Sequence, residues 1–320
     1  MNEASPINAS ASSALRTGFV AALGAYTIWG LFPIFLRALS DASAPEILSH
    51  RIVWAVPFGM LILTLRKQWP EVRAALTNPR VLRVLFLTGA VIALNWLIYV
   101  WAVGNGRILE ASLGYYINPL MYVAAGVYIL GESLRRMQII AVALATIGVL
   151  VLMIGGGVFP WVSFVLAISF TAYGYFRKTA NVGAMPGLFI EVLLLSPLAT
   201  VYLIWLAQSG GLAFLHGNSD LDLLLVLAGP VTVTPLVLFA IAARRLTLTT
   251  LGFIQYIGPT LQFMLGLYYG ETFTLYHAIC FTMIWLALGV FSADAIRQNR
   301  RAVQIGAGAI AQNKPEGASR

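Results

Sequence analysis

The sequence has little charge and almost no cysteine. Only 10% of its 320 residues are charged, whereas a soluble domain carries roughly 25%. The single cysteine, Cys280, excludes a disulfide within the chain. The three histidines have no metal-ligand spacing, and no Gly-x-x-x-x-Gly-Lys-Ser/Thr motif is present to hold nucleotide phosphates. The sequence therefore predicts no metal, no cofactor and no ATP hydrolysis by this chain.

Apolar sequence is what the chain has in abundance. Hydrophobic residues make up 59% of it, and they form ten runs long enough to cross about 30 Å of hydrocarbon. We expect all ten to be helices, because a backbone exposed to lipid must satisfy its own hydrogen bonds. The predicted spans are 17–36, 46–65, 84–103, 109–130, 137–154, 160–176, 186–206, 223–243, 249–269 and 275–292.

The chain also repeats itself after about 140 residues. The segment from Tyr116 to Pro119 returns as the segment from Tyr256 to Pro259, and prolines 45 and 57 return as prolines 186 and 197. Each half holds five spans, an odd number, so we expect the halves to be antiparallel. The predicted organisation is a disordered tail (1–15), a five-helix repeat (16–154), a second, inverted five-helix repeat (155–297) and a disordered tail (298–320).

Basic residues are placed unevenly along the chain. Successive connections between spans lie on alternate sides of the membrane, and with ten spans both termini lie on the same side. Of the 20 Lys and Arg residues, 17 lie on the side that holds the termini. Arg37 and Arg107 lie on the other side, and Arg51 lies within the second span. This asymmetry predicts that both termini are cytoplasmic. The net charge of +8 is thus a topology signal and not a nucleic-acid footprint, with membrane lipids as the expected electrostatic partner. The Arg-rich segment 66–83 is expected to be an interfacial loop or short helix.

Two matching spans carry stripes of polar residues and proline. In 249–269, Gln255, Pro259 and Gln262 share one helical face, and the matching positions of 109–130 are Tyr115, Pro119 and Tyr122. A proline in mid-span frees a backbone carbonyl and bends the helix. We interpret these stripes as candidate linings of a cavity for a small polar solute, with helix packing as the alternative. Their neighbours Tyr116, Asn118 and Tyr256 are further candidates.

Polar and aromatic side chains in two other spans are candidates for the same cavity. Asn95 and Tyr99 share a face of the third span, and Trp29 lies towards the middle of the first. An Asn in mid-membrane needs a partner, which is either another helix or the solute. For Trp29 the alternative is a place in the aromatic belt at the membrane interface.

Three ionisable residues within the spans are candidates for coupling or gating. Burying an Arg costs at least about 2.5 kcal/mol, so Arg51 and its neighbour His50 are expected to face a cavity or a partner. The alternative is that Arg51 snorkels or pairs with Glu46 or Glu110. Glu191, the repeat partner of His50, lies within an apolar stretch, where a carboxylate can exchange protons near neutral pH. Its alternative is a structural hydrogen bond between helices.

The chain resembles the EamA-domain branch of the drug/metabolite transporter superfamily, and within it the RarD family. The resemblance covers about residues 16–297. It rests on the strings Tyr26-Thr-Ile-Trp29-Gly30, Ser49-His50-Arg51-Ile-Val-Trp54, Leu94-Asn95-Trp96, Glu110-Ala-Ser-Leu-Gly-Tyr-Tyr-Ile-Asn118-Pro119 and Leu251-Gly-Phe-Ile-Gln255-Tyr256. The resemblance implies ten helices, cytoplasmic termini and a bacterial inner-membrane exporter of small metabolites or drugs, with amino-acid-like solutes or chloramphenicol-type compounds as candidate substrates.

Three functional classes remain open at this stage. A secondary transporter, proton-linked or facilitative, fits the repeat and the buried polar groups best. A lipid flippase on the same scaffold is the second class. A membrane-embedded enzyme is the third, but it needs a compact catalytic cluster, and only Glu46, His50 and Arg51 lie close together in the sequence. The sequence carries no signal for an oligomeric state.

Overall fold

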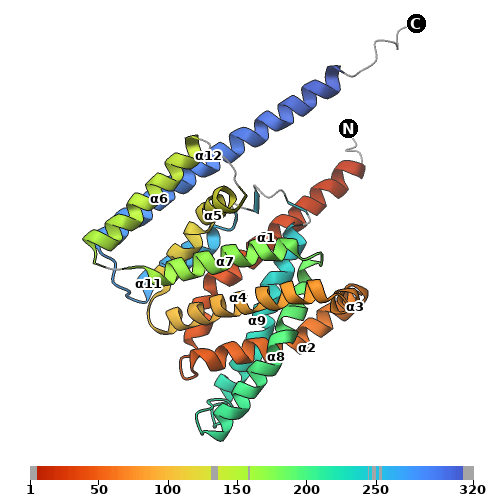
Figure 1. Cartoon of the computed structure of the whole chain (residues 1–320), viewed down its shortest axis with the longest axis vertical. Coiled ribbons are helices and arrows are strands. Elements are labelled where there is room, and N and C mark those ends of the chain that lie inside the picture. Colours follow the sequence, from red (N-terminus) through yellow and green to blue (C-terminus); the bar gives the residue numbers. More distant parts are fainter. Residues whose placement is uncertain are drawn as a thin grey trace. The chain divides into compact units, whose positions relative to one another are not determined.

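The computed structural model describes residues 6–130, 136–157, 159–243, 245–246, 250–251 and 254–312. The regular structure within these ranges is entirely helical (Figure 1). The helices are α1 (Pro6–Arg37), α2 (Ala44–Leu65), α3 (Trp69–Leu76), α4 (Pro79–Gly104), α5 (Ile108–Leu130), α6 (Arg136–Gly155), α7 (Trp161–Thr179), α8 (Ala184–Gln208), α9 (Ser219–Ala243), α11 (Ile257–Tyr268) and α12 (Leu275–Gln312).

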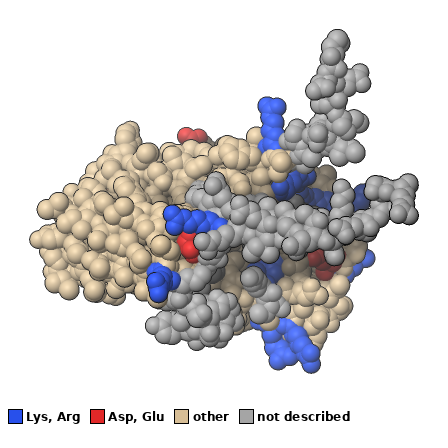
Figure 2. Space-filling model, turned by 90° about the horizontal axis from the view of Figure 1, so that it is seen from above, with Lys and Arg blue, Asp and Glu red and all other residues tan. Residues whose placement is uncertain are grey.

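The chain is an all-helical, multi-pass membrane protein. In the described ranges, seven helical segments are long and apolar enough to cross a membrane: Leu15–Arg37, Ala44–Leu65, Pro79–Gly104, Arg136–Gly155, Ala184–Gln208, Ser219–Ala243 and Leu275–Asp294. Helices α5, α7 and α11 lie at the three other predicted spans. Large apolar side chains point outward along these helices, including Leu198 (71% exposed) and Val201 (63% exposed) on α8. Most of the surface in Figure 2 accordingly carries neither basic nor acidic residues.

One predicted span differs from the structure. At the two ends of the chain, helix α1 begins at Pro6 and α12 continues to Gln312. The division into two repeats with disordered tails at 1–15 and 298–320 stays a prediction. The predicted span 249–269 is interrupted at Gln255 and Tyr256, which form a turn before α11 begins. The carbonyl of Gln255 accepts from the N–H of Gly258, because the residue after Gly258 is a proline, which has no N–H.

The chain divides into two compact units, of which the larger comprises 1–122 and 160–273. Within it, α2 packs on α8 and α9, α1 on α9 and α11, and α4 on α7 and α8. Glycines permit the closest approaches: a Cβ atom at Gly229 of α9 would lie 2.3 Å from the carbonyl carbon of Trp54 in α2. A Cβ atom at Gly89 of α4 would lie 3.5 Å from that of Glu191 in α8. Small residues at such crossings let helices pack tightly in lipid.

The smaller unit comprises 123–159 and 274–320, and its core is the pairing of α6 with α12 (Figure 1). A Cβ atom at Gly148 would lie 2.9 Å from that of Met283 and 3.1 Å from the backbone carbonyl oxygen of Cys280. The pairing therefore depends on a backbone contact at a small residue, as in the larger unit.

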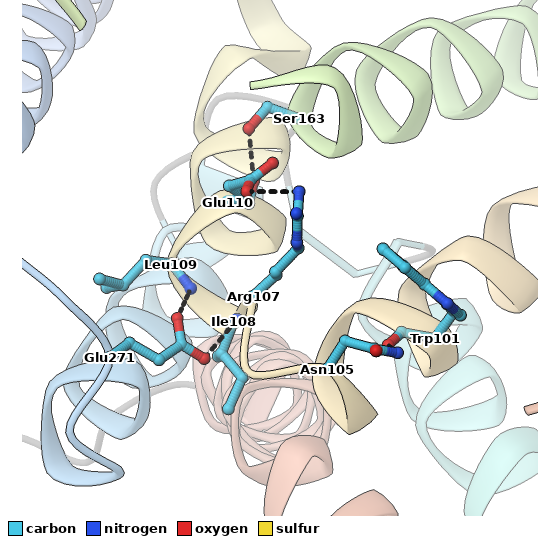
Figure 3. A network of polar contacts seen from close by, with 8 residues as sticks. All are labelled: Trp101, Asn105, Arg107, Ile108, Leu109, Glu110, Ser163 and Glu271. Atoms are coloured by element: carbon cyan, nitrogen blue, oxygen red, sulfur yellow. Dashed lines mark hydrogen bonds and ion pairs between the residues drawn. The ribbon is translucent and has the colours of Figure 1, made fainter. Parts of the chain in front are cut away.

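A polar network holds the start of α5 in place (Figure 3). Both carboxylate oxygens of Glu271 accept backbone hydrogen bonds, from Ile108 N–H at 2.6 Å and Leu109 N–H at 2.8 Å. Glu110 pairs with Arg107 at 3.1 Å. Glu271 thus satisfies two of the orphan N–H groups of a helix N-terminus, where a negative charge is also favourable.

The segment predicted to be an interfacial loop or short helix contains the helix α3. Asn78 separates α3 from α4 and its side chain accepts from the N–H groups of Arg80 and Val81, which begins the next helix. The location of this segment at the membrane interface stays a prediction.

Candidate functional site

Arg51 is buried in the larger unit, with 4% of its surface exposed. Its Nε donates to the Thr232 hydroxyl of α9 at 3.0 Å. The guanidinium carbon lies 4.9 Å from the ring centre of Phe32 and 4.8 Å from that of Trp96. Nη1 has no hydrogen-bond partner among the described residues. A buried cation that faces aromatic rings, without an ion pair in the described parts of the chain, is energetically costly.

The structural alternatives predicted for Arg51 are not formed. Glu46 accepts instead from the N–H groups of Ala213 (2.8 Å) and Phe214 (3.2 Å), in the connection between α8 and α9. Glu110 pairs with Arg107. Both carboxylates are therefore used elsewhere, and Arg51 is too deeply buried to snorkel.

Two tyrosines extend the aromatic surroundings of the Arg51 guanidinium beyond Phe32. The ring of Tyr99 stacks on that of Phe32, with centroids 6.1 Å apart, and lies 5.7 Å from that of Tyr115. Tyr99 is 4% exposed, and its hydroxyl has no hydrogen-bond partner among the described residues. Arg51 and Tyr99 thus both present unused hydrogen-bond donors.

A line of aromatic rings continues from this point towards Glu191. The ring of Tyr115 lies 6.3 Å from that of Phe170, which lies 6.3 Å from that of Tyr173. The Tyr173 hydroxyl donates to Glu191 Oε2 at 3.2 Å. We call Phe32, Tyr99, Tyr115, Phe170 and Tyr173 the aromatic line. It draws on α1, α4, α5 and α7, and it connects two buried ionisable residues that come from different halves of the chain.

Glu191 is fully buried and has three donors. The Thr88 hydroxyl donates to Oε1 at 2.6 Å, Tyr173 donates to Oε2, and Arg177 Nε lies 3.5 Å from Oε1. Arg177 is itself positioned by the carbonyls of Val182 (3.2 Å) and Gly183 (2.7 Å). This Glu191 cluster ties together α4, α7 and α8, and its donors suit an ionised carboxylate better than a protonated one.

His50 faces a different neighbourhood from Arg51. Trp54 Nε1 donates to its Nδ1 at 3.1 Å, which places the imidazole proton on Nε2. Nε2 is buried and has no partner among the described residues, and the ring lies 4.8 Å from that of Phe214. Adjacent helical residues point about 100° apart, so the two neighbours do not converge on one point.

Several candidates from the polar stripes form a second group, between α1, α5 and α11. Gln262 Nε2 donates to the carbonyl of Trp29 at 3.0 Å. The Tyr116 hydroxyl lies 2.7 Å from that of Thr260, and its ring stacks on that of Tyr256 with centroids 6.3 Å apart. Tyr115 and Tyr116, which are adjacent in the sequence, thus belong to separate groups. The stripes predicted as one lining divide between two places.

The remaining candidates are scattered. Asn95 donates to the Leu166 carbonyl (3.1 Å) and the Ser169 hydroxyl (2.9 Å) of α7, so another helix is its partner. Asn118 is buried, and its Oδ1 has no hydrogen-bond partner among the described residues. The remaining stripe residues are Pro119 within α5, Pro259 within α11 and Gln255 in the turn before α11. The side chain of Tyr122 lies outside the described residues.

Known proteins resemble the chain over most of its length. Residues 16–154 match the EamA-like transporter family. A protein called "Protein RarD" from Streptomyces exfoliatus is 44% identical over 89% of this chain and 91% of its own length. The chain belongs to the RarD family of EamA-like transporters. "Protein RarD" from Escherichia coli is 42% identical (89% and 97% covered), and an "Uncharacterized transporter" from Vibrio cholerae is 46% identical (90% and 95% covered).

One solved structure has a similar fold to this RarD-family chain. It is described as "Crystal structure of protein", with a TM-score of 0.53 at 19% identity, and it covers 87% of this chain and 96% of its own. The matching family and the relative from Vibrio cholerae are named transporters, which makes this chain a membrane transporter of the drug/metabolite type.

Sequence reasoning missed four residues that contact Arg51 or Glu191, or that belong to the aromatic line, in this RarD-family chain: Phe32, Thr88, Phe170 and Arg177. Arg177 carried a signal that could have been used. Arg177 lies in the last turn of α7, and Glu191 lies about two turns after the start of α8. A short connection between two helices brings the end of the first close to the start of the second. Arg177 was instead counted only as a basic residue that reports topology. The other three are apolar or small side chains within apolar runs, and nothing local distinguishes them.

Proposed function

We propose that this chain is a secondary transporter that exports small metabolites or drugs across the bacterial inner membrane by alternating access. The observation that carries the proposal is the aromatic line between buried Arg51 and buried Glu191. Ionisable residues within membrane helices are rare, and they mark the path of a solute or an ion.

The pairing of helices supports an inverted ten-helix repeat. In such a repeat, each predicted span of the first half has a counterpart five spans later in the second half. The counterparts are α1 and α7, α2 and α8, α4 and α9, α5 and α11, and α6 and α12. The counterpart of the α1–α9 contact is then the α7–α4 contact, and the counterpart of α2–α9 is α8–α4; both counterparts are formed. The α2–α8 and α6–α12 pairs are their own counterparts. The α5–α7 counterpart of the α1–α11 contact includes the hydrogen bond from the Ser163 hydroxyl to the Glu110 carbonyl at 2.6 Å. Most of these helix contacts therefore map onto one another, as a two-fold relation between the halves requires.

The two buried ionisable residues take related positions in this scheme. Pro45 and Pro186 are 141 positions apart, whereas Pro57 and Pro197 are 140 apart, so the counterpart of Glu191 is His50 by the first spacing and its neighbour Arg51 by the second. Arg51 bonds to a threonine of α9, and Glu191 bonds to a threonine of α4, which is the counterpart of α9. In alternating access, such equivalent positions exchange their environments between the inward- and outward-open states.

We assign solute coupling to protons taken up by Glu191. The residue lies within the Glu191 cluster, so protonation would weaken its pairing with Arg177 and loosen α4, α7 and α8. Amphipathic, amino-acid-like solutes and chloramphenicol-type compounds are the candidate substrates.

The experiment is solute flux into proteoliposomes, measured with a panel of amino acids, small carboxylates and chloramphenicol, with and without a pH gradient. Gradient-dependent flux of one class of solute supports the proposal. Folded, reconstituted protein that moves no solute of the panel contradicts it, and a lipid-scrambling assay on the same vesicles then tests the flippase alternative.

The proposed orientation has a direct test by cysteine labelling. Cys280 is fully buried, so the native protein should not react with a membrane-impermeant maleimide. In intact cells, single cysteines introduced in the 210–218 connection should be labelled, and those in 67–78 only after permeabilisation. The opposite pattern would reverse the assignment of cytoplasmic termini.

A further inference from the structure

We propose that Arg51 binds the carboxylate of the transported solute, and that this solute carries a single carboxylate on an apolar or aromatic body. The inference deepens the proposed function, on which it rests for the statement that the ligand is transported. It gives Arg51 the role of a binding group and not of a gate.

The first argument is an unbalanced charge. Arg51 has no acidic side chain within ion-pair distance in the part of the chain that the structure describes. The carboxylates of Glu46 and Glu191 have other partners: Glu46 accepts from backbone N–H groups and Glu191 pairs with Arg177. A buried cation without a counter-ion is costly, and a bound anion offsets that cost.

The second argument is the geometry of the donors. Nη1 of Arg51 and the Tyr99 hydroxyl are both buried and unpartnered among the described residues, while Nε is held by Thr232. Thr232 in turn donates to the Ala228 carbonyl at 2.7 Å, so it fixes the guanidinium without competing for an anion. A fixed guanidinium with free N–H groups suits a carboxylate, because charge-assisted hydrogen bonds are among the strongest in proteins.

The third argument concerns the rest of the ligand. The groups around the guanidinium are the aromatic rings of Phe32, Trp96, Tyr99 and Tyr115. Solute sites combine a few polar groups with mostly apolar and aromatic walls. One unpaired positive charge also matches one negative charge, which favours a monocarboxylate over a dicarboxylate or a phosphate dianion.

A free monocarboxylate and a zwitterionic amino acid share this chemistry. The aromatic faces could hold an ammonium group by cation–π contact. Matched probes distinguish the two sources: 3-phenylpropionate carries the carboxylate alone, and L-phenylalanine carries both charges. Their amides, 3-phenylpropionamide and L-phenylalaninamide, lack the carboxylate.

The test is calorimetric binding to the purified full-length protein in detergent, without any gradient. We expect at least one carboxylate probe to bind at millimolar concentration or below, and its amide to bind at least tenfold more weakly. Arg51→Gln should remove that preference and Arg51→Lys should restore part of it. Tyr99→Phe, which removes only the hydroxyl, should weaken carboxylate binding severalfold.

Arg107→Gln is the matched control. Arg107 also lies over two tryptophan rings, at 5.5 Å from Trp101 and 6.0 Å from Trp161, but it has its own carboxylate partner. Its loss should leave probe binding unchanged. Equal binding of acid and amide, a preference that survives Arg51→Gln in folded protein, or no binding of either carboxylate would each overturn the inference.

The outcomes also separate this inference from the proposed function. If the probes bind in an Arg51-dependent way but no solute crosses the proteoliposome membrane, the carboxylate site is supported and the proposed transport is contradicted. If neutral solutes cross and carboxylates are not preferred, the proposed transport is supported and the carboxylate site is contradicted.

Discussion

Glu191→Gln should abolish solute accumulation driven by a pH gradient while solute exchange at equal pH continues. The amide oxygen of a glutamine can still accept from Thr88, and its NH2 group can donate to the Tyr173 hydroxyl, so packing in the Glu191 cluster is retained. It cannot take up and release a proton. With one proton per solute, a gradient of one pH unit supports about a tenfold solute gradient, because it stores 1.36 kcal/mol. The variant should show no accumulation.

The matched control is Glu110→Gln. Glu110 is also a partly buried carboxylate paired with an arginine, but its partner Arg107 lies in the connection before α5, away from the aromatic line. This variant should accumulate solute as the native protein does. If Glu191→Gln protein still accumulates solute in proportion to the pH gradient, Glu191 is not the coupling group.

Gly229→Ala should unfold the protein or sharply lower its melting temperature. The added methyl group would lie 2.3 Å from the carbonyl carbon and 2.5 Å from the carbonyl oxygen of Trp54. These are backbone atoms of α2, so relief requires α2 and α9 to separate. Overpacking of this kind costs typically about 1–3 kcal/mol and occasionally more, against about 1 kcal/mol gained by replacing glycine in a helix.

Gly289→Ala in α12 is the control, because no atom of another described helix lies within 4 Å of its Cβ position. It should keep or raise the melting temperature, by roughly 0.5–1 kcal/mol of stability. Melting curves from tryptophan fluorescence in detergent give both values. Equal melting temperatures for the two variants would mean that α2 and α9 do not pack as closely as described.

The Gly229 variant also bears on the site. Thr232, the partner of Arg51, lies one helical turn from Gly229 on α9. Any protein that folds with α9 displaced should therefore lose the carboxylate preference proposed for Arg51.

The helices were predictable from the sequence to within a few residues for most spans. A backbone in lipid has no alternative to internal hydrogen bonds, so an apolar run of sufficient length becomes a helix. The interruption at Gln255 was not predicted, although Pro259 was noted. The matching Pro119 lies in a helix that continues through it, so proline alone does not determine whether a helix breaks.

The candidate site was predictable only in part. Arg51 and Glu191 could be selected because charged residues within apolar runs are conspicuous, and Tyr99 and Tyr115 could be selected as polar groups in mid-span. Helical periodicity placed Tyr115 with Gln262 in one lining, but it reports the face of a single helix and not what that face meets. The structure places Tyr115 against α4 and α7, and Gln262 against α1.

The sequence by itself determined that this protein is a helical membrane protein built on a repeat, and which ionisable residues lie within its spans. These properties follow from local composition and from spacing along the chain. Only the tertiary structure decided what those residues meet: Glu191 bonds to Thr88, 103 positions away, and Arg51 to Thr232, 181 positions away. Such contacts depend on which helices cross and at what depth, and packing between helices sets both.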